Sequence, residues 1–200
     1  MNQSQTDPRV IIIGAGMSGL LMAIKLLEAG NRNFCIYEKA HKVGGTWREN
    51  TYPNIACDVF APAYNFSFDP NTEWNWRFGR GEEIQRYFEK IEKKYGLTDF
   101  IQFNTTVDDA RWQDDQWHIT TANGTEQADV LVSAVGALHH PRYPDIEGLN
   151  DFKGPCFHTA RWDHTADLYD KNVGVIGTGS TAAQVVPGIV DKVAKLKLFQ

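Results

Sequence analysis

The segment Val10–Gly19 reads VIIIGAGMSG, and it is followed by LLMAIKLLEAG and then by NRNFCIYEK. The apolar, β-branched run over residues 9–13 predicts a buried strand. Apolar residues at helical spacing predict a helix over residues 17–29, which Gly30 ends, and residues 33–37 predict a second strand. Strand, turn, helix and strand in this order form a βαβ unit, so the sequence predicts an α/β fold with a Rossmann-like parallel sheet.

Three glycines in the first turn, Gly14, Gly16 and Gly19, have the G-x-G-x-x-G spacing. The first allows a tight turn, the second lets a pyrophosphate approach the backbone, and the third lets helix and strand pack closely. The N-terminus of the following helix offers unpaired N–H groups to the phosphates. Glu38 stands about 20 residues further on, where a carboxylate can accept hydrogen bonds from ribose hydroxyls. The pattern predicts a dinucleotide site; a chance glycine turn and a surface acid are the alternatives.

The same spacing recurs near the end of the chain, after a second short apolar run. Gly177, Gly179 and Ala182 lie in the sequence GTGSTA, which precedes a predicted helix over residues 181–193 and a strand over 195–199. A second phosphate-binding turn is therefore predicted, with a plain strand–helix turn as the alternative.

The region between the two motifs has a different pattern. Residues 41–71 show no sustained period, and an irregular segment of this length inside a domain is usually functional. Residues 82–95 predict an amphipathic helix. Short strands and turn signals over residues 100–121 predict a small antiparallel β insertion, and the apolar residues 129–135 predict one more buried strand.

Composition excludes several classes of protein. The chain has 200 residues and a net charge of -5, and this mild acidity argues against a nucleic-acid partner. Its apolar runs are too short for a secretion signal or a stable membrane insertion, so we expect a cytoplasmic protein. The three cysteines show no CxxC spacing, which disfavours a thiol redox pair, a disulfide framework and a bound metal. Cys35, in a predicted buried strand, is interpreted as a small core hydrophobe.

The irregular segment carries a resemblance to a known family. Residues 44–47 (GGTW), followed by Tyr52-Pro53 and Asp58, resemble the G-G-x-W-x(4)-Y-P-G-x(3)-D segment of class B flavin-dependent monooxygenases. Asn54 stands where those enzymes usually carry glycine. Because asparagine tolerates left-handed backbone angles better than most residues, the turn can be retained.

A second signature precedes the second glycine motif. Residues 152–163 read F-x-G-x(3)-H-x(3)-W-D, which matches the fingerprint of Baeyer–Villiger monooxygenases at every defined position. The related N- and S-oxidising flavin monooxygenases commonly lack the Trp-Asp ending. The fingerprint residues are Phe152, Gly154, His158, Trp162 and Asp163.

The resemblance covers nearly the whole chain and implies its organisation. Residues 1–146 would form the N-terminal part of a Rossmann-like FAD-binding domain with the small antiparallel β insertion. Residues 147–171 would be the linker that carries the fingerprint, and residues 172–200 the start of a second Rossmann-like domain, for NADPH. In this family His158 would lie on the linker and help couple domain motion to catalysis, with a purely structural histidine as the alternative.

The resemblance also implies the residues of both cofactor sites. Thr46 would donate a hydrogen bond along the FAD, Trp47 would supply a flat apolar wall, and Asp58 would act in catalysis beside the flavin ring. The implied FAD contacts are Gly14, Gly16, Met17, Ser18, Gly19, Glu38, Lys39, Gly45, Thr46, Trp47, Asp58, Tyr64 and Val107. The implied NADPH contacts are Gly177, Thr178, Gly179, Ser180, Thr181 and Gln184.

The implied activity is that of an FAD- and NADPH-dependent monooxygenase. It would insert one oxygen atom of O2 into a ketone, by way of a flavin 4a-peroxide, and give an ester or lactone. Two alternatives stay open: an N- or S-oxygenating flavin-containing monooxygenase acting on an amine or thioether, and a non-catalytic FAD-binding fragment. The last is considered because two complete dinucleotide domains need roughly 150 residues each, so 200 residues alone need not be active.

Overall fold

The computed structural model describes residues 7–200, so the first residues of the predicted domain 1–146 lie outside it. The chain forms two compact units. Unit 1 comprises Met1–Arg48 and Gln85–His139, and unit 2 comprises Glu49–Ile84 and His140–Gln200. The domain boundaries expected after residues 146 and 171 remain predictions, because these units follow packing within the chain and not cofactor sites.

Unit 1 is built on a parallel sheet whose strand order among the described residues is β5-β2-β1-β9. Strand β1 pairs along its whole length with β2 on one side and β9 on the other, so that Ile12 lies opposite Ile36 and Val132. The predicted strand–helix–strand unit is confirmed, with ends that differ by a residue. The bounds are β1 Val10–Ile13, α1 Met17–Glu28, β2 Phe34–Tyr37, β5 Ile101–Gln102 and β9 Val130–Ser133.

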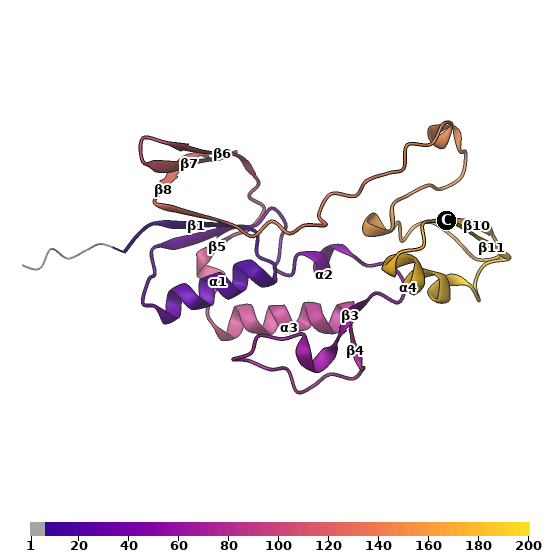
Figure 1. Cartoon of the computed structure of the whole chain (residues 1–200), viewed down its shortest axis with the longest axis horizontal. Helices are drawn as coiled ribbons and strands as arrows, with labels where there is room; N and C mark the ends of the chain where they lie inside the picture. Colours follow the sequence, from indigo (N-terminus) through magenta and orange to yellow (C-terminus); the bar gives the residue numbers. More distant parts are fainter. Residues whose placement is uncertain (1–6) are drawn as a thin grey trace, which may run out of the picture. The chain divides into compact units, whose positions relative to one another are not determined.

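The two faces of this sheet are covered by different kinds of element. Figure 1 shows α1 along one face and an antiparallel sheet on the other. Successive strand residues point to opposite faces. Ile11 and Tyr37 therefore pack against Ile119 and Ala128 of the antiparallel sheet, whereas the Ile12 side chain lies against α1. Helix α3 (Gly81–Lys94), predicted over residues 82–95, has its buried residues at helical spacing.

The antiparallel sheet confirms the predicted β insertion from residue 107 onward, whereas the strand expected near residue 100 is β5 of the parallel sheet. The antiparallel sheet contains β6 (Val107–Gln113), β7 (Gln116–Thr121) and β8 (Gly124–Ala128) in that order. Asp114 and Asp115 both have positive φ, 51° and 59°, which is the pattern of a tight type I′ hairpin turn. Strand β8 was not predicted, because its sequence GTEQA lacks apolar alternation and its strand conformation depends on pairing with β7.

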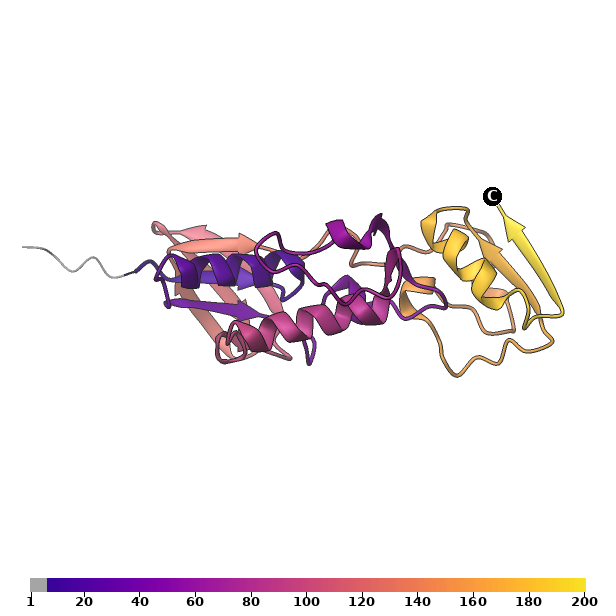
Figure 2. The same cartoon turned by 90° about the horizontal axis from the view of Figure 1, so that it is seen from below.

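Unit 2 contains small paired strands and one longer helix. The core of unit 2 gathers Tyr52, Val185 and Ile189, and Figure 2 shows α4 beside the last two strands. The helix ends earlier than predicted, and Pro187 in its last turn has no N–H to continue the hydrogen-bond ladder. The elements are β3 Ala56–Phe60, β4 Phe78–Arg80, β10 Asn172–Ile176, α4 Ser180–Ile189 and β11 Lys195–Phe199.

Short helical elements complete the described chain. They are α2 Thr46–Glu49 and the 3-10 turns η1 Ala61–Ala63, η2 Thr98–Phe100, η3 Leu149–Asp151 and η4 Thr159–Arg161. Of the helices within residues 7–200, none has the length and apolar character needed to cross a membrane. The same residues contain no cluster of His, Cys, Asp or Glu suited to holding a metal ion.

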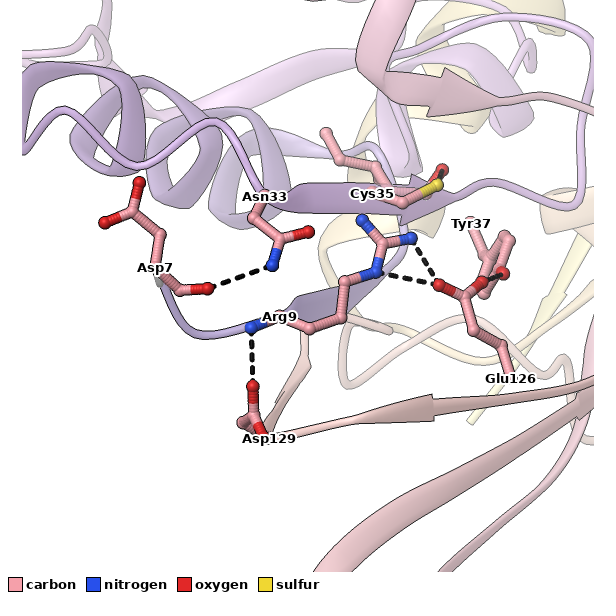
Figure 3. Close-up of polar contacts among 8 residues, drawn as sticks. Asp7, Arg9, Asn33, Cys35, Tyr37, Glu126 and Asp129 are labelled. Atoms are coloured by element: carbon pink, nitrogen blue, oxygen red, sulfur yellow. Dashed lines mark hydrogen bonds and ion pairs between the residues drawn. The ribbon is translucent and has the colours of Figure 1, made fainter. Parts of the chain in front are cut away.

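A polar cluster joins the start of β1 to the antiparallel sheet (Figure 3). The carboxylate of Glu126 on β8 accepts hydrogen bonds from the Arg9 guanidinium and from the Tyr37 hydroxyl, with 2.8 Å from Arg9 Nε. Burial, together with this bond, raises the pKa of the Tyr37 hydroxyl, which therefore remains a donor. Burial also raises the pKa of the neighbouring Cys35 thiol to about 11, consistent with its role in the core.

We expect Glu126→Ala to lower the free energy of unfolding by about 1–3 kcal/mol, because it removes the acceptor of two partly buried donors, Arg9 and Tyr37. Urea unfolding followed by circular dichroism measures this loss. The control is Asp109→Ala, which breaks an ion pair with the largely exposed Arg111 on β6 and should change stability by less than about 1 kcal/mol. Equal losses in both variants would contradict a structural role for the cluster.

Candidate dinucleotide site

The first glycine turn, between β1 and α1, is packed too tightly for side chains. A Cβ on Gly19 would lie 1.9 Å from the carbonyl oxygen of Gly14, and one on Gly14 would lie 2.7 Å from the carbonyl oxygen of Ala134. Gly14 also has a φ of +100°. The motif spacing is therefore explained by backbone packing at its first and third positions.

The start of α1 is suited to an anion. Gly16 is the N-cap residue, and within the described chain no side chain caps it. Met17 and Ser18 open the helix, and Ser18 is exposed. The first N–H groups of a helix have no intrahelical acceptor, and they carry the positive end of the helix dipole. A pyrophosphate at this position would satisfy them.

The Gly44-Gly45 segment lies directly against this turn. The N–H of Gly44 donates to the carbonyl of Ala15 at 3.0 Å. A Cβ on Gly45 would lie 3.3 Å from the Cα of Gly16, and a Cβ on Gly44 would overlap the amide of Gln85, 1.9 Å from its Oε1. The structure thus joins two motifs that are 25 or more residues apart in sequence into one backbone-lined cradle. We define the cradle as residues 14–19 together with Gly44 and Gly45.

Glu38 is the buried acid of the cradle, with 4% of its surface exposed. One carboxylate oxygen accepts from the N–H of Ala15 at 2.8 Å, and the other accepts from the N–H of Ala40 at 2.9 Å and lies 3.1 Å from Arg48. An ionised carboxylate offers about four acceptor positions. Glu38 can therefore hold the turn and still accept a bond from a ribose hydroxyl.

Arg48 and Gln85 are site residues that the sequence did not reveal. The side chain of Arg48 is 7% exposed, and besides Glu38 it binds the carbonyl of Lys42 at 2.7 Å. Gln85 on α3 donates to the carbonyl of Val43 at 3.0 Å, beside Gly44. The sole sequence signal was that Arg48 directly follows the GGTW motif.

The other predicted FAD contacts are distributed over both units. In unit 1, Thr46 and Trp47 form the first residues of α2, and Val107 begins β6. The exposed side chain of Lys39 contacts His139. In unit 2, Asp58 is exposed on β3 and Tyr64 follows η1, half-buried.

The second glycine turn, in unit 2, is open where the first is crowded. Among the described residues, no atom lies within 4 Å of a Cβ added to Gly177 or Gly179. Gly177 has a φ of +107°, so of these two positions only residue 177 requires glycine for its backbone angle. Thr178 and Ser180 are exposed, and Thr181 is half-buried at the start of α4. This turn leaves backbone N–H groups accessible to a phosphate.

Gln184 lies on α4, and its amide is turned toward β3. It hydrogen-bonds with the backbone of Ala56 and with the Asp58 carboxylate. The Asn54 turn before β3 has the left-handed conformation expected of it, with a φ of 63°. Burial raises the pKa of the Tyr52 hydroxyl in the same segment.

The fingerprint residues shape turns of the linker. Nδ1 of His158 accepts from the N–H of Ala160 at 3.1 Å and caps the turn η4. Asp163 accepts from the hydroxyl and the N–H of Thr165, and these bonds lower the pKa of its carboxyl. A Cβ on Gly154 would lie 2.8 Å from the ring of Phe152, so this glycine makes room for that ring. The ring of Trp162 lies edge-on to that of its neighbour Phe157.

A glycine turn between a parallel strand and a helix, with a buried acid at the end of the next strand, defines the class of dinucleotide-binding α/β proteins. Comparisons with known proteins narrow this class. A family model described as pyridine nucleotide-disulphide oxidoreductase matches residues 11–200. An uncharacterized monooxygenase of Mycobacterium tuberculosis is 52% identical over 194 residues, and a Baeyer–Villiger monooxygenase of Streptomyces coelicolor is 47% identical over 194 residues. The matches cover 96% of this chain and 39% and 37% of those proteins.

Solved structures agree with the sequence relatives. The complex of OTEMO with FAD and NADP is 33% identical with a TM-score of 0.89, and the match covers 98% of this chain and 39% of that one. Cyclohexanone monooxygenase with bound ε-caprolactone is 35% identical with a TM-score of 0.89, and the match covers 96% and 39%. The chain belongs to the pyridine nucleotide-disulphide oxidoreductase family, and over nearly its whole length it is similar to part of a Baeyer–Villiger monooxygenase and of cyclohexanone monooxygenase. It spans about two fifths of the length of these proteins.

The two glycine turns should respond differently to the same substitution. We expect Gly19→Ala to destabilise the protein by about 2–4 kcal/mol, because the new methyl group meets the Gly14 carbonyl inside a packed turn. Gly179→Ala is the matched control; its φ of -74° suits alanine, and stability should change by less than about 0.5 kcal/mol. Thermal unfolding of both variants measures the difference. If Gly19→Ala is as stable as Gly179→Ala, the close contact between Gly19 and the Gly14 carbonyl is contradicted.

Proposed function

We propose that this protein is an FAD- and NADPH-dependent monooxygenase that converts a ketone to an ester or lactone with O2. The observation that carries the proposal is the cradle, in which the first glycine turn, Gly44-Gly45 and buried Glu38 form one backbone-lined surface. Its support is that the OTEMO complex contains FAD and NADP, and that relatives are named Baeyer–Villiger monooxygenases. ε-Caprolactone, bound in the cyclohexanone monooxygenase structure, is itself a lactone.

The residues of the cradle fit an FAD. Close approach of backbone to backbone leaves room for a pyrophosphate at the uncapped start of α1, where Gly16, Met17 and Ser18 present their N–H groups. Glu38 would accept from the adenosine ribose, and Arg48 would hold that carboxylate in position. Thr46, Trp47, Tyr64 and Val107 would contact the rest of the cofactor, and Lys39 lies next to Glu38.

The second turn would hold NADPH. Gly177 to Thr181 present an open backbone at the start of α4, as a phosphate requires. Bound FAD would supply the redox chemistry, taking a hydride from NADPH and activating O2. The protein would position both cofactors, exclude water, and hold the carboxylate of Asp58 near the reacting atoms. The fingerprint, through the turn capped by His158, would shape the linker.

Product analysis tests the proposal. With a cyclic ketone, NADPH and 18O2, we expect a lactone that contains one labelled oxygen atom, because one atom of O2 enters the product. A thioether offered under the same conditions gives the comparison, and gas chromatography with mass spectrometry identifies the products. Formation of sulfoxide without lactone would instead assign the protein to the heteroatom-oxygenating branch. Absence of any oxygenated product would contradict the proposal.

Asp58→Ala is the informative variant for the same assay. Loss of a charged group that stabilises a reacting atom should slow lactone formation by about tenfold or more. Asp109→Ala, at a partly exposed position on the antiparallel sheet, is the matched control and should react at the normal rate.

A further inference from the structure

The side chain of Gln184 is bound to the segment that contains Asp58. Within the described chain it takes part in hydrogen bonds with three residues: Oε1 accepts from the N–H of Ala56 at 3.0 Å and from the hydroxyl of Tyr52 at 3.1 Å. Nε2 donates to the carbonyl of Ala56 at 2.9 Å and to Oδ1 of Asp58 at 3.0 Å. The amide therefore contacts both backbone groups of Ala56, as a neighbouring strand would.

The chemistry of these partners fixes the orientation of the amide. A backbone N–H can only donate and a backbone carbonyl can only accept. Oε1 must therefore face the N–H of Ala56, and Nε2 must face its carbonyl. In this orientation one of the hydrogens on Nε2 of Gln184 is directed at the Asp58 carboxylate.

Helix α4 packs closely against the segment before β3, so the hydrogen bond from Gln184 can position Asp58. Val185 and Ile189, on the same helix, share a core cluster with Tyr52. A Cβ on Gly188 would lie 2.8 Å from the side chain of Pro53, so the helix backbone approaches this segment closely. Gln184 is the fifth residue of α4, the helix that begins directly after Gly179 of the second glycine turn.

The bond leaves the carboxylate accessible. Asp58 is exposed, and it lines a cavity of about 470 Å³ together with Gln184, Arg77 and Arg80. One carboxylate oxygen is thus held by an amide whose own position is set by the backbone of β3. A side chain held in this way loses fewer conformations when it acts on a ligand.

We propose that Gln184 is a positioning residue, which orients the Asp58 carboxylate and links it to the helix of the second glycine turn. The inference rests on the proposed function, in which Asp58 acts near the reacting atoms. It differs from the expectation that Gln184 contacts NADPH, since the amide is engaged by residues 52–58. Changes at the second turn would then be transmitted to Asp58 through α4 and this one side chain.

The first test needs no cofactor. We expect Gln184→Met, which has similar length but cannot hydrogen-bond in this way, to raise the hydrogen-exchange rate of the Ala56 amide by about tenfold. Exchange measured by NMR or mass spectrometry reports it. Gln127→Met, at an exposed position on β8, is the matched control and should leave Ala56 unchanged. An unchanged Ala56 rate in Gln184→Met would overturn the proposal, whether or not the protein proves to be a monooxygenase.

The second test separates a positioning role from a cofactor contact. Gln184→Met should lower kcat for ketone oxidation by about tenfold and leave the KM for NADPH nearly unchanged. In the Asp58→Ala background the same substitution should have no further effect on kcat, because the two residues act through one bond. A raised KM for NADPH at unchanged kcat, or an equal fall of kcat in both backgrounds, would overturn the proposal.

A second variant keeps this test decisive if Gln184→Met does not fold. Gln184→Glu keeps the size of the side chain but replaces the donor to Asp58 by a carboxylate oxygen, and it should lower kcat in the same way. If neither the normal protein nor any variant oxidises a ketone, the proposed function fails, and the exchange of Ala56 alone decides whether Gln184 holds the strand.

Discussion

Backbone-to-backbone contact at the first glycine turn is the constraint on which the rest of the site depends. Gly19 lies so close to the Gly14 carbonyl that no side chain fits there, and Gly45 lies close against the Cα of Gly16. These contacts set the angle at which α1 leaves the sheet and so direct its first N–H groups. The irregular segment after β2 can then lie on the turn, where Gly44 donates to Ala15.

A buried ion pair completes this arrangement. Glu38 and Arg48 are both almost fully buried, and removal of water from two charges is costly unless each is well paired. Here the cost is offset by the N–H groups of Ala15 and Ala40, which also bind Glu38. The same carboxylate thus fixes the turn and holds Arg48, and in the proposed function it also accepts from the ribose. In unit 2 the neutral amide of Gln184 likewise fixes a backbone segment, because it hydrogen-bonds to both backbone groups of Ala56 on β3.

Much of unit 1 could be predicted from sequence because its elements are encoded locally. The β-branched run before Gly14, the helical spacing after Gly16 and the turn at Asp114-Asp115 each determine their structure within a few residues. Strands β3, β4 and β8 could not be predicted in this way, since their strand conformation depends on pairing with partners elsewhere in the chain. The motif residues were found by their spacing, but Arg48 and Gln85 interact over distances that no period encodes. The direction of the Gln184 side chain was likewise unpredictable, because it is set by the packing of α4.

The proposed function requires that the cradle binds FAD and that NADPH reduces the bound flavin. The visible absorption spectrum of the purified protein after incubation with FAD and gel filtration, recorded before and after anaerobic addition of NADPH, tests this claim directly. We expect a bound-flavin spectrum that bleaches when NADPH is added. A colourless protein that retains no FAD would contradict it, and a bound flavin that NADPH cannot bleach would contradict the role of the second turn.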